Sequence, residues 1–289
     1  MRRLNSLFCC ATALVVAASA AALTLAPTHA LDTAAPKQAA AEAKQAAAEV
    51  KQATPQKYEC TAPSELTRLD YALERVSQRV AAALPLKIVA IGSSSTAGAG
   101  ASSPEMSYPA RLQVELQGLM PRVPVTVINR GANGEESRDM LARFERDVFA
   151  EKPDLVLWQA GSNSVLRDRP LSEAPPILNQ GLKLLSEHGA DVVLVNPQYA
   201  PKVITRHDVE GMVHLMAVTA KQKSVSLFQR FAVMRYWQLT EGIPFSSFLS
   251  SDELHLNDWS YGCIAKLLGG AIHDAATRPT MTATAGARR

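Results

Sequence analysis

Short apolar runs that alternate with helical patterns constrain the fold of this chain most. Five runs have the length of buried strands, and they lie at 86–91, 123–128, 155–158, 192–195 and 225–228. Patterns typical of helices lie between and after them, at 107–120, 137–150, 171–188, 207–222 and 258–276. Alternating strands and helices predict βαβ units, and strands apolar on both faces predict a parallel sheet covered by helices on both sides. We therefore expect an α/β fold, a single three-layer α/β/α domain with a mainly parallel five-stranded sheet.

A further helix is expected ahead of the first strand. Its apolar residues recur at three- and four-residue spacing and form one stripe: Leu66, Leu69, Leu73, Val76 and Val80. About 200 residues suffice for one such domain with a full core, so no second domain is expected.

The two ends of the chain differ from this pattern. Arg2 and Arg3, the apolar run at 14–25 and the small residues near Ala30 predict a signal peptide over 1–30, so the protein is expected to be exported, either periplasmic or secreted. An uncleaved anchor is the alternative, for which the run is short. The near-repeats of Ala, Lys, Gln and Glu at 31–59 predict a solvated spacer before a domain at 60–277. Residues 278–289 are expected to be a disordered tail.

Charge and cysteine content narrow the partners and the compartment. The net charge is +3, and removal of residues 1–30 takes away two arginines and no acids, which leaves +1. The basic residues form no stripe, so nucleic acid is not an expected partner. No segment after residue 30 is long and apolar enough to cross a bilayer, so no stable membrane span is expected after cleavage. Cys60 and Cys263 remain in the mature chain. In an oxidising compartment they could form a disulfide, and two buried free thiols are the alternative.

Polar, glycine-containing segments follow the first three predicted strands. They lie at 92–96, 129–134 and 161–164. Ligands of parallel sheets bind beyond the carboxyl ends of the strands, which is where these segments are expected. Asp252 and His255 lie far downstream. A serine hydroxyl, an imidazole base and a carboxylate that orients the imidazole are the parts of acyl-transfer chemistry. From the residues alone, any of the three serines at 93–95 could be the nucleophile.

Four segments together resemble the sequence blocks of the SGNH hydrolases, the GDSL-like esterases and lipases. They are 92–96, 129–134, 161–164 and 252–257, which occur in the family's order. The resemblance implies the flavodoxin-like SGNH fold and a catalytic triad of Ser94, His255 and Asp252. It also implies an oxyanion hole built from the Ser94 backbone, Gly134 and Asn163. Ser93 and Ser95 are then expected to hydrogen-bond to backbone groups of their own loop.

Two positions depart from the family's pattern. Ser93 and Ser164 stand where the family usually has aspartate. Neither position supplies the nucleophile or an oxyanion donor. The departures therefore leave the predicted catalytic residues complete and concern the fine structure of the two loops.

The sequence thus predicts an exported serine esterase that acts on small-molecule or carbohydrate esters with short-chain or O-acetyl groups. No cofactor is expected: no lysine follows the glycines at 92–100 as a nucleotide-binding loop requires, and the histidines lack the spacing of metal ligands. Two alternatives stay open. One is an O-acyltransferase that uses the same residues, and the other is a non-catalytic carbohydrate-binding module with the same fold.

Overall fold

The computed structural model describes residues 58–278, and its centre is a five-stranded sheet. All strands are parallel, in the order β2-β1-β3-β4-β5. Their bounds are Leu86–Gly92 (β1), Val125–Gly131 (β2), Leu155–Gln159 (β3), Asp191–Val195 (β4) and Ser226–Phe228 (β5). This is the flavodoxin-like order of doubly wound sheets.

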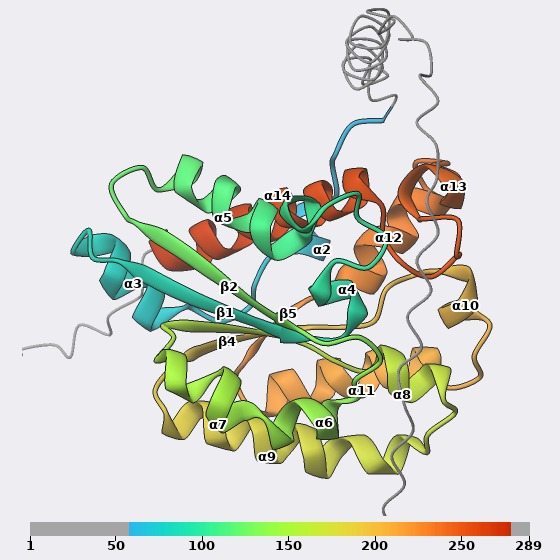
Figure 1. The fold of residues 1–289 in the computed structure, drawn as a ribbon, viewed down its shortest axis with the longest axis horizontal. Helices are drawn as coiled ribbons and strands as arrows, with labels where there is room; N and C mark the ends of the chain where they lie inside the picture. Colours follow the sequence, from blue (N-terminus) through green and yellow to red (C-terminus); the bar gives the residue numbers. More distant parts are fainter. Residues whose placement is uncertain (1–57, 279–289) are drawn as a thin grey trace, which may run out of the picture. The chain divides into compact units, whose positions relative to one another are not determined.

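Helices cover both faces of the sheet (Figure 1). One face carries α5 (Tyr108–Leu119) and α14 (Asp258–Thr277), and the other carries α6 (Ser137–Ala142), α9 (Ala174–Glu187) and α11 (Val209–Gln222). The remaining helices are α2 (Ser64–Thr67), α3 (Glu74–Ala81), α4 (Ser94–Ala97), α7 (Phe144–Asp147), α8 (Ser162–Leu166), α10 (Pro201–Ile204), α12 (Arg230–Leu239) and α13 (Phe245–Phe248). The predicted α/β/α domain with a five-stranded sheet is confirmed.

The strands differ in burial as their sequences indicate. Every residue of β3 is buried, and so is all of β1 except Lys87, because helices cover both faces. Strand β2 lies at an edge and is only partly buried. Its outward N–H groups at Val125 and Val127 donate to the side chains of Gln117 and Gln113 of α5. Two N–H groups of this edge strand are therefore already paired within the domain.

The prediction of a single helix over the stripe from Leu66 to Val80 is wrong, because the structure has two helices there, α2 and α3. Between them the backbone N–H and C=O of Tyr71 both hydrogen-bond to the Ser226 hydroxyl, each at 3.1 Å. Asp191 then accepts the Val76 N–H at 3.0 Å in the first turn of α3. These long-range bonds to β4 and β5 outweigh the local helical pattern. The stretch at 137–150 is likewise broken into α6, α7 and a 3₁₀ turn.

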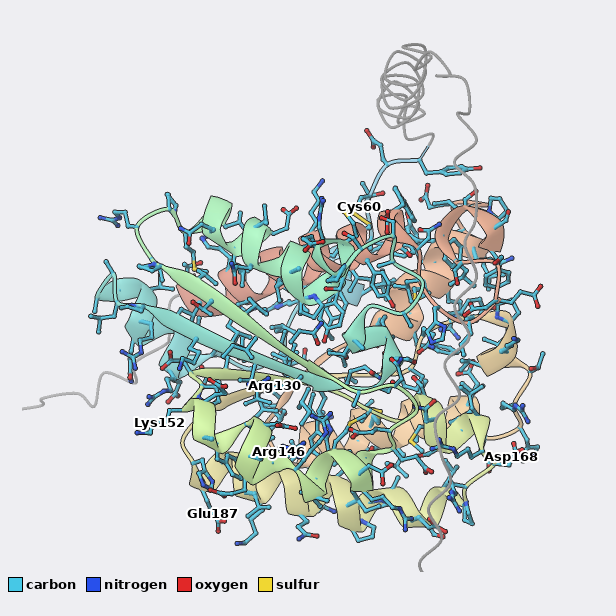
Figure 2. The ribbon with its side chains drawn as sticks, viewed as in Figure 1. Cys60, Arg130, Arg146, Lys152, Asp168 and Glu187 are labelled. Carbon is cyan, nitrogen blue, oxygen red and sulfur yellow. A yellow bond between two sulfur atoms is a disulfide. The ribbon has the colours of Figure 1, made fainter. Side chains whose placement is uncertain are left out.

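A disulfide joins Cys60 to Cys263 of α14, with Cα atoms 5.3 Å apart (Figure 2). It ties the segment ahead of α2 to the last helix. The predicted signal peptide, all but the last two residues of the spacer and all but the first residue of the tail lie outside the described residues. Within residues 58–278 we find no helix with the length and apolar character of a membrane span.

Candidate active site

The turn from β1 into α4 presents Ser94 at the carboxyl edge of the sheet. Gly92 ends the strand, and a Cβ there would lie 2.1 Å from Thr96 Oγ1, so only glycine fits. Ser94 is the first residue of α4 and is partly exposed, while Ser93 and Ser95 on either side are buried. Gly131, at the end of β2, packs equally closely, since its Cβ would lie 2.1 Å from the Ala97 nitrogen. The sheet edge and α4 are therefore in direct contact.

His255 and Asp252 lie on the loop between α13 and α14. His255 Nε2 is 2.8 Å from Ser94 Oγ, and its Nδ1 is 2.5 Å from Asp252 Oδ2. The second oxygen, Asp252 Oδ1, accepts the backbone N–H groups of Leu254 at 3.0 Å and His255 at 2.9 Å. A carboxylate three residues before the imidazole can thus reach it because the chain folds tightly around that carboxylate. The three side chains form one continuous hydrogen-bonded chain from carboxylate to hydroxyl.

Neighbouring segments fix this loop in place. Asn257 caps α14, with its side chain accepting the Ser260 N–H at 3.2 Å, so the helix begins directly after the His255 segment. The loop after α4 packs on the same segment: a Cβ on Gly100 would lie 2.4 Å from the Leu256 carbonyl oxygen and 2.9 Å from His255 Cβ. Gly100 also has a φ of +89°, which favours glycine.

The environment of Asp252 favours its ionised form. Partial burial acts to raise the pKa of its carboxyl, but hydrogen bonds from the His255 backbone and ring, the Ser250 hydroxyl and the Leu254 N–H outweigh it. The net effect holds the pKa of Asp252 well below its usual range. A charged carboxylate therefore faces His255 Nδ1 at neutral pH and favours the tautomer that leaves Nε2 free to accept a proton.

Three candidate donors of an oxyanion hole lie on loops at the same edge. Among the described residues, the N–H groups of Ser94 and Gly134 have no hydrogen-bond acceptor. Gly134 has a φ of +78°, and its carbonyl accepts from Arg167 Nη2 at 2.7 Å. The Asn163 amide donates one N–H to the Glu135 carbonyl at 2.8 Å, which leaves its second N–H to donate elsewhere. The structure therefore links Asn163 of α8 directly to the loop that carries Gly134.

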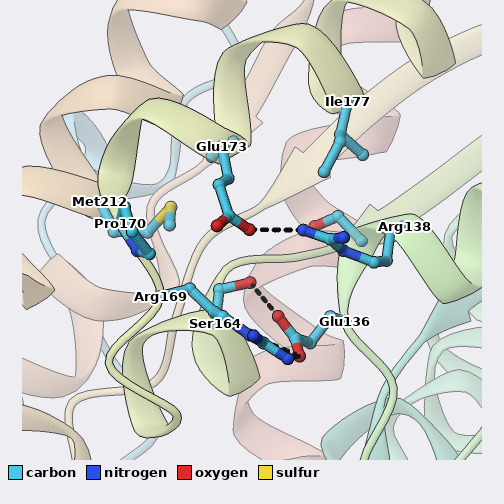
Figure 3. A pocket seen from close by; sticks show the side chains of 10 residues that line it. Glu136, Arg138, Ser164, Arg169, Pro170, Glu173, Ile177 and Met212 are labelled. Atoms are coloured by element: carbon cyan, nitrogen blue, oxygen red, sulfur yellow. Dashed lines mark hydrogen bonds and ion pairs between the residues drawn. The ribbon is translucent and has the colours of Figure 1, made fainter.

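A charged pocket lies beside these donors, around Glu136 (Figure 3). Glu136 is 7% exposed and pairs with Arg167 Nη1 at 2.8 Å and with Arg169 at 3.4 Å. Ser164 donates to the other carboxylate oxygen at 3.3 Å. An aspartate at position 164 would point a second carboxylate at Glu136. The departure at Ser164 thus has a physical reason in this chain.

The expected partners of Ser93 and Ser95 are wrong. The Ser93 hydroxyl donates to Gln159 Oε1 of β3 at 2.9 Å, and the Ser95 hydroxyl accepts from Arg230 Nη1 of α12 at 2.9 Å. Both serines point into the domain rather than along their own loop, so side chains from other strand ends reach them. Sequence reasoning missed Gln159, Gln198 and Arg230. Functional residues of a parallel sheet are expected just after the carboxyl ends of its strands. This expectation also applies to these three residues, because they lie at or within three residues of the ends of β3, β4 and β5.

No site for a metal ion emerges near these residues: within 58–278 no three His, Cys, Asp or Glu side chains lie close enough together to hold one. What the arrangement provides is a polarised serine hydroxyl beside unpaired N–H donors. That combination suits nucleophilic attack on a carbonyl carbon.

Comparisons with known proteins agree with this chemistry. Residues 59–278 match the model of the non-GDSL lipase-like family. An acetylxylan esterase of Geobacillus stearothermophilus is 37% identical over 75 residues, which are 26% of this chain and 32% of that protein. An arylesterase of Vibrio mimicus is 31% identical over 121 residues, 42% of this chain and 59% of that protein. The matched segments thus span about a third of the length of the first relative and about three fifths of the length of the second.

Solved structures are also similar to this chain, and one of them covers most of it. It is a two-domain esterase active on acetylated mannans, with a TM-score of 0.63 at 20% identity. The alignment covers 74% of this chain and 56% of that one. At this level of identity the likeness concerns the fold.

Proposed function

The chain belongs to the non-GDSL lipase-like family, and on that premise we propose that it is an exported serine esterase that hydrolyses short-chain or O-acetyl carboxylic esters. The observation that carries the proposal is the hydrogen-bonded chain from Asp252 through His255 to the Ser94 hydroxyl, at 2.5 and 2.8 Å. The relatives described as an acetylxylan esterase and an arylesterase support the same class of reaction. Export rests on the sequence of residues 1–30.

In the proposed reaction, Ser94 Oγ attacks the ester carbonyl carbon and its proton passes to His255 Nε2. The tetrahedral intermediate collapses, the bond to the alcohol oxygen breaks, and the alcohol leaves with the proton from His255. Water then attacks the acyl-enzyme, with His255 again accepting a proton. The bond between the acyl carbon and Ser94 Oγ then breaks while His255 returns the proton to that oxygen, which releases the carboxylic acid and restores the Ser94 hydroxyl. Asp252 stays ionised throughout and stabilises the imidazolium.

The negative charge on the carbonyl oxygen needs donors that are already in position. We assign this role to the Ser94 N–H, the Gly134 N–H and the second N–H of the Asn163 amide. Two of them have no other acceptor among the described residues, and Asn163 is held by its bond to Glu135. Donors that need not reorganise during the reaction give the largest stabilisation.

Turnover of a panel of esters tests the proposal. We expect the purified protein to hydrolyse p-nitrophenyl acetate and to release acetate from acetylated xylan or mannan, and Ser94→Ala to abolish both activities. A clear preference for long acyl chains would contradict the proposed substrate class. Transfer of the acetyl group to an added sugar, in preference to water, would favour an acyltransferase. A folded protein without turnover on any ester would favour a binding module.

A further inference from the structure

A fully buried arginine lies directly behind the candidate site. Arg230 is the first residue of α12, two residues after β5, and is only 1% exposed. Burial lowers the pKa of its guanidinium to about 10, so it remains charged at neutral pH. Among residues 58–278 its hydrogen-bond acceptors are the neutral oxygen atoms of Ser95, Asn196 and Gln198, and none of them is a carboxylate. Burial of a cation without a carboxylate partner costs free energy of folding, which its hydrogen bonds must offset.

Each of the three guanidinium nitrogens donates one hydrogen bond. Nη1 donates to Ser95 Oγ at 2.9 Å, Nη2 to Gln198 Oε1 at 3.0 Å, and Nε to the Asn196 carbonyl at 3.0 Å. Ser95 directly follows the candidate nucleophile. The fork therefore connects α4 to the segment after β4 through one rigid, planar group.

Gln198 extends the network to the other two parts of the site. Its Oε1 also accepts the Ser162 hydroxyl at 2.8 Å, and its Nε2 donates to the Leu254 carbonyl at 3.4 Å. Ser162 directly precedes Asn163, and Leu254 directly precedes His255. One buried cluster thus reaches the neighbours of the nucleophile, the amide donor and the base, which come from three separate segments of the chain.

We propose that Arg230 is a positioning residue that sets the spacing of Ser94, Asn163 and His255 through its hydrogen bonds to Ser95 and Gln198. The inference rests on the proposed esterase function and deepens it. Its physical basis is geometric, since a displacement of 1 Å in a group remote from the reacting atoms can cost about 10²-fold in rate. A lysine carries the same charge, but its three N–H groups share one nitrogen and cannot reproduce the planar fork that reaches Ser95, Gln198 and the Asn196 carbonyl together.

The variant Arg230→Lys separates geometry from charge, because lysine keeps the cation and loses the planar fork. We expect kcat on p-nitrophenyl acetate to fall about 10- to 100-fold while KM changes less than about threefold. The rate of Ser94 labelling by a fluorophosphonate should fall by a similar factor, since it depends on the same serine and base.

A control variant removes another arginine that serves stability alone. Arg79 binds the buried carboxylate of Asp154 at 2.8 Å, and Asp154 also accepts the N–H of Lys87 near the start of β1, at the opposite edge of the sheet. We expect Arg79→Met to lower the melting temperature and to leave kcat within about twofold of the native value.

Three results distinguish the outcomes. If Arg230→Lys lowers the melting temperature but keeps kcat and the labelling rate within about twofold, as Arg79→Met is expected to do, the positioning role is refuted. If Arg230→Lys does not fold, two other variants test the network: Ser95→Ala removes the bond to Arg230 Nη1, and Gln198→Met removes the bonds to Arg230, Ser162 and the Leu254 carbonyl. A loss of kcat at unchanged KM in both supports the proposal, and native kcat in both overturns it. If the native protein neither turns over esters nor labels, the proposed function itself fails.

Discussion

Replacement of Asn163 by alanine tests the assignment of the oxyanion hole, because this side chain has two separable roles. One amide N–H donates to the Glu135 carbonyl at 2.8 Å, which is a contribution to the fold. The second N–H is the proposed donor to the oxyanion. The loss of a neutral hydrogen bond costs about 0.5–1.5 kcal/mol of folding free energy. The loss of an oxyanion donor costs about 2.7–4 kcal/mol of transition-state stabilisation.

These magnitudes predict a folded but slow enzyme. For Asn163→Ala we expect kcat on p-nitrophenyl acetate to fall about 10²- to 10³-fold with little change in KM. Urea unfolding should show a loss of stability of about 1 kcal/mol. The matched control is Ser164→Ala in the same helix, which removes only the 3.3 Å bond to Glu136. Its kcat should stay within about twofold of native. A kcat within about threefold of native for Asn163→Ala, with reduced stability, would show that this amide only supports the loop.

Three further predictions follow from the same structure. Replacement of both Cys60 and Cys263 by alanine opens a loop with a sequence separation of 203 residues, so we expect a stability loss of up to about 5 kcal/mol in urea unfolding, and unchanged kcat in the molecules that remain folded. Gly100→Ala places a Cβ 2.4 Å from the Leu256 carbonyl beside His255, so kcat should fall at least about tenfold, whereas Gly118→Ala, where nothing lies within 4 Å, should leave kcat unchanged; equal activity of the two variants would contradict the close packing. Burial raises the pKa of Asp191 from 3.8 to about 6, so the native protein should lose stability relative to Asp191→Asn as the pH rises from about 4 to 6, and melting curves with a constant difference across this range would contradict the shift.

The sheet was predictable because its strands are short, apolar and buried on both faces. The predicted runs at 86–91 and 155–158 match β1 and β3 to within one residue. The predicted helix at 107–120 matches α5 equally closely. The predictions that were wrong concern regions whose structure depends on contacts between residues far apart in the sequence. The break between α2 and α3 rests on bonds to Ser226 and Asp191, which lie more than a hundred residues away.

The candidate site likewise has a part that the sequence predicted and a part that it did not. The resemblance to family blocks singled out Ser94 and His255, and these two side chains lie 2.8 Å apart in the structure. The buried layer beneath them was not anticipated, because Ser95 and Gln198 look like ordinary loop residues until Arg230 is placed between them. Arginine usually lies on the surface, so the residue type does not predict that Arg230 is buried, although its position two residues after β5 places it at the functional edge of the sheet.

The most direct measurement is to label the protein with a fluorophosphonate and to identify the modified peptide by mass spectrometry. Serine lies at three consecutive positions, 93 to 95, and only the hydroxyl hydrogen-bonded to His255 Nε2 is activated as a nucleophile. We predict a single phosphonate adduct on Ser94, and no adduct in His255→Ala at the same reagent concentration. An adduct on Ser93 or Ser95, or labelling that persists without the imidazole, would contradict a nucleophile activated by His255.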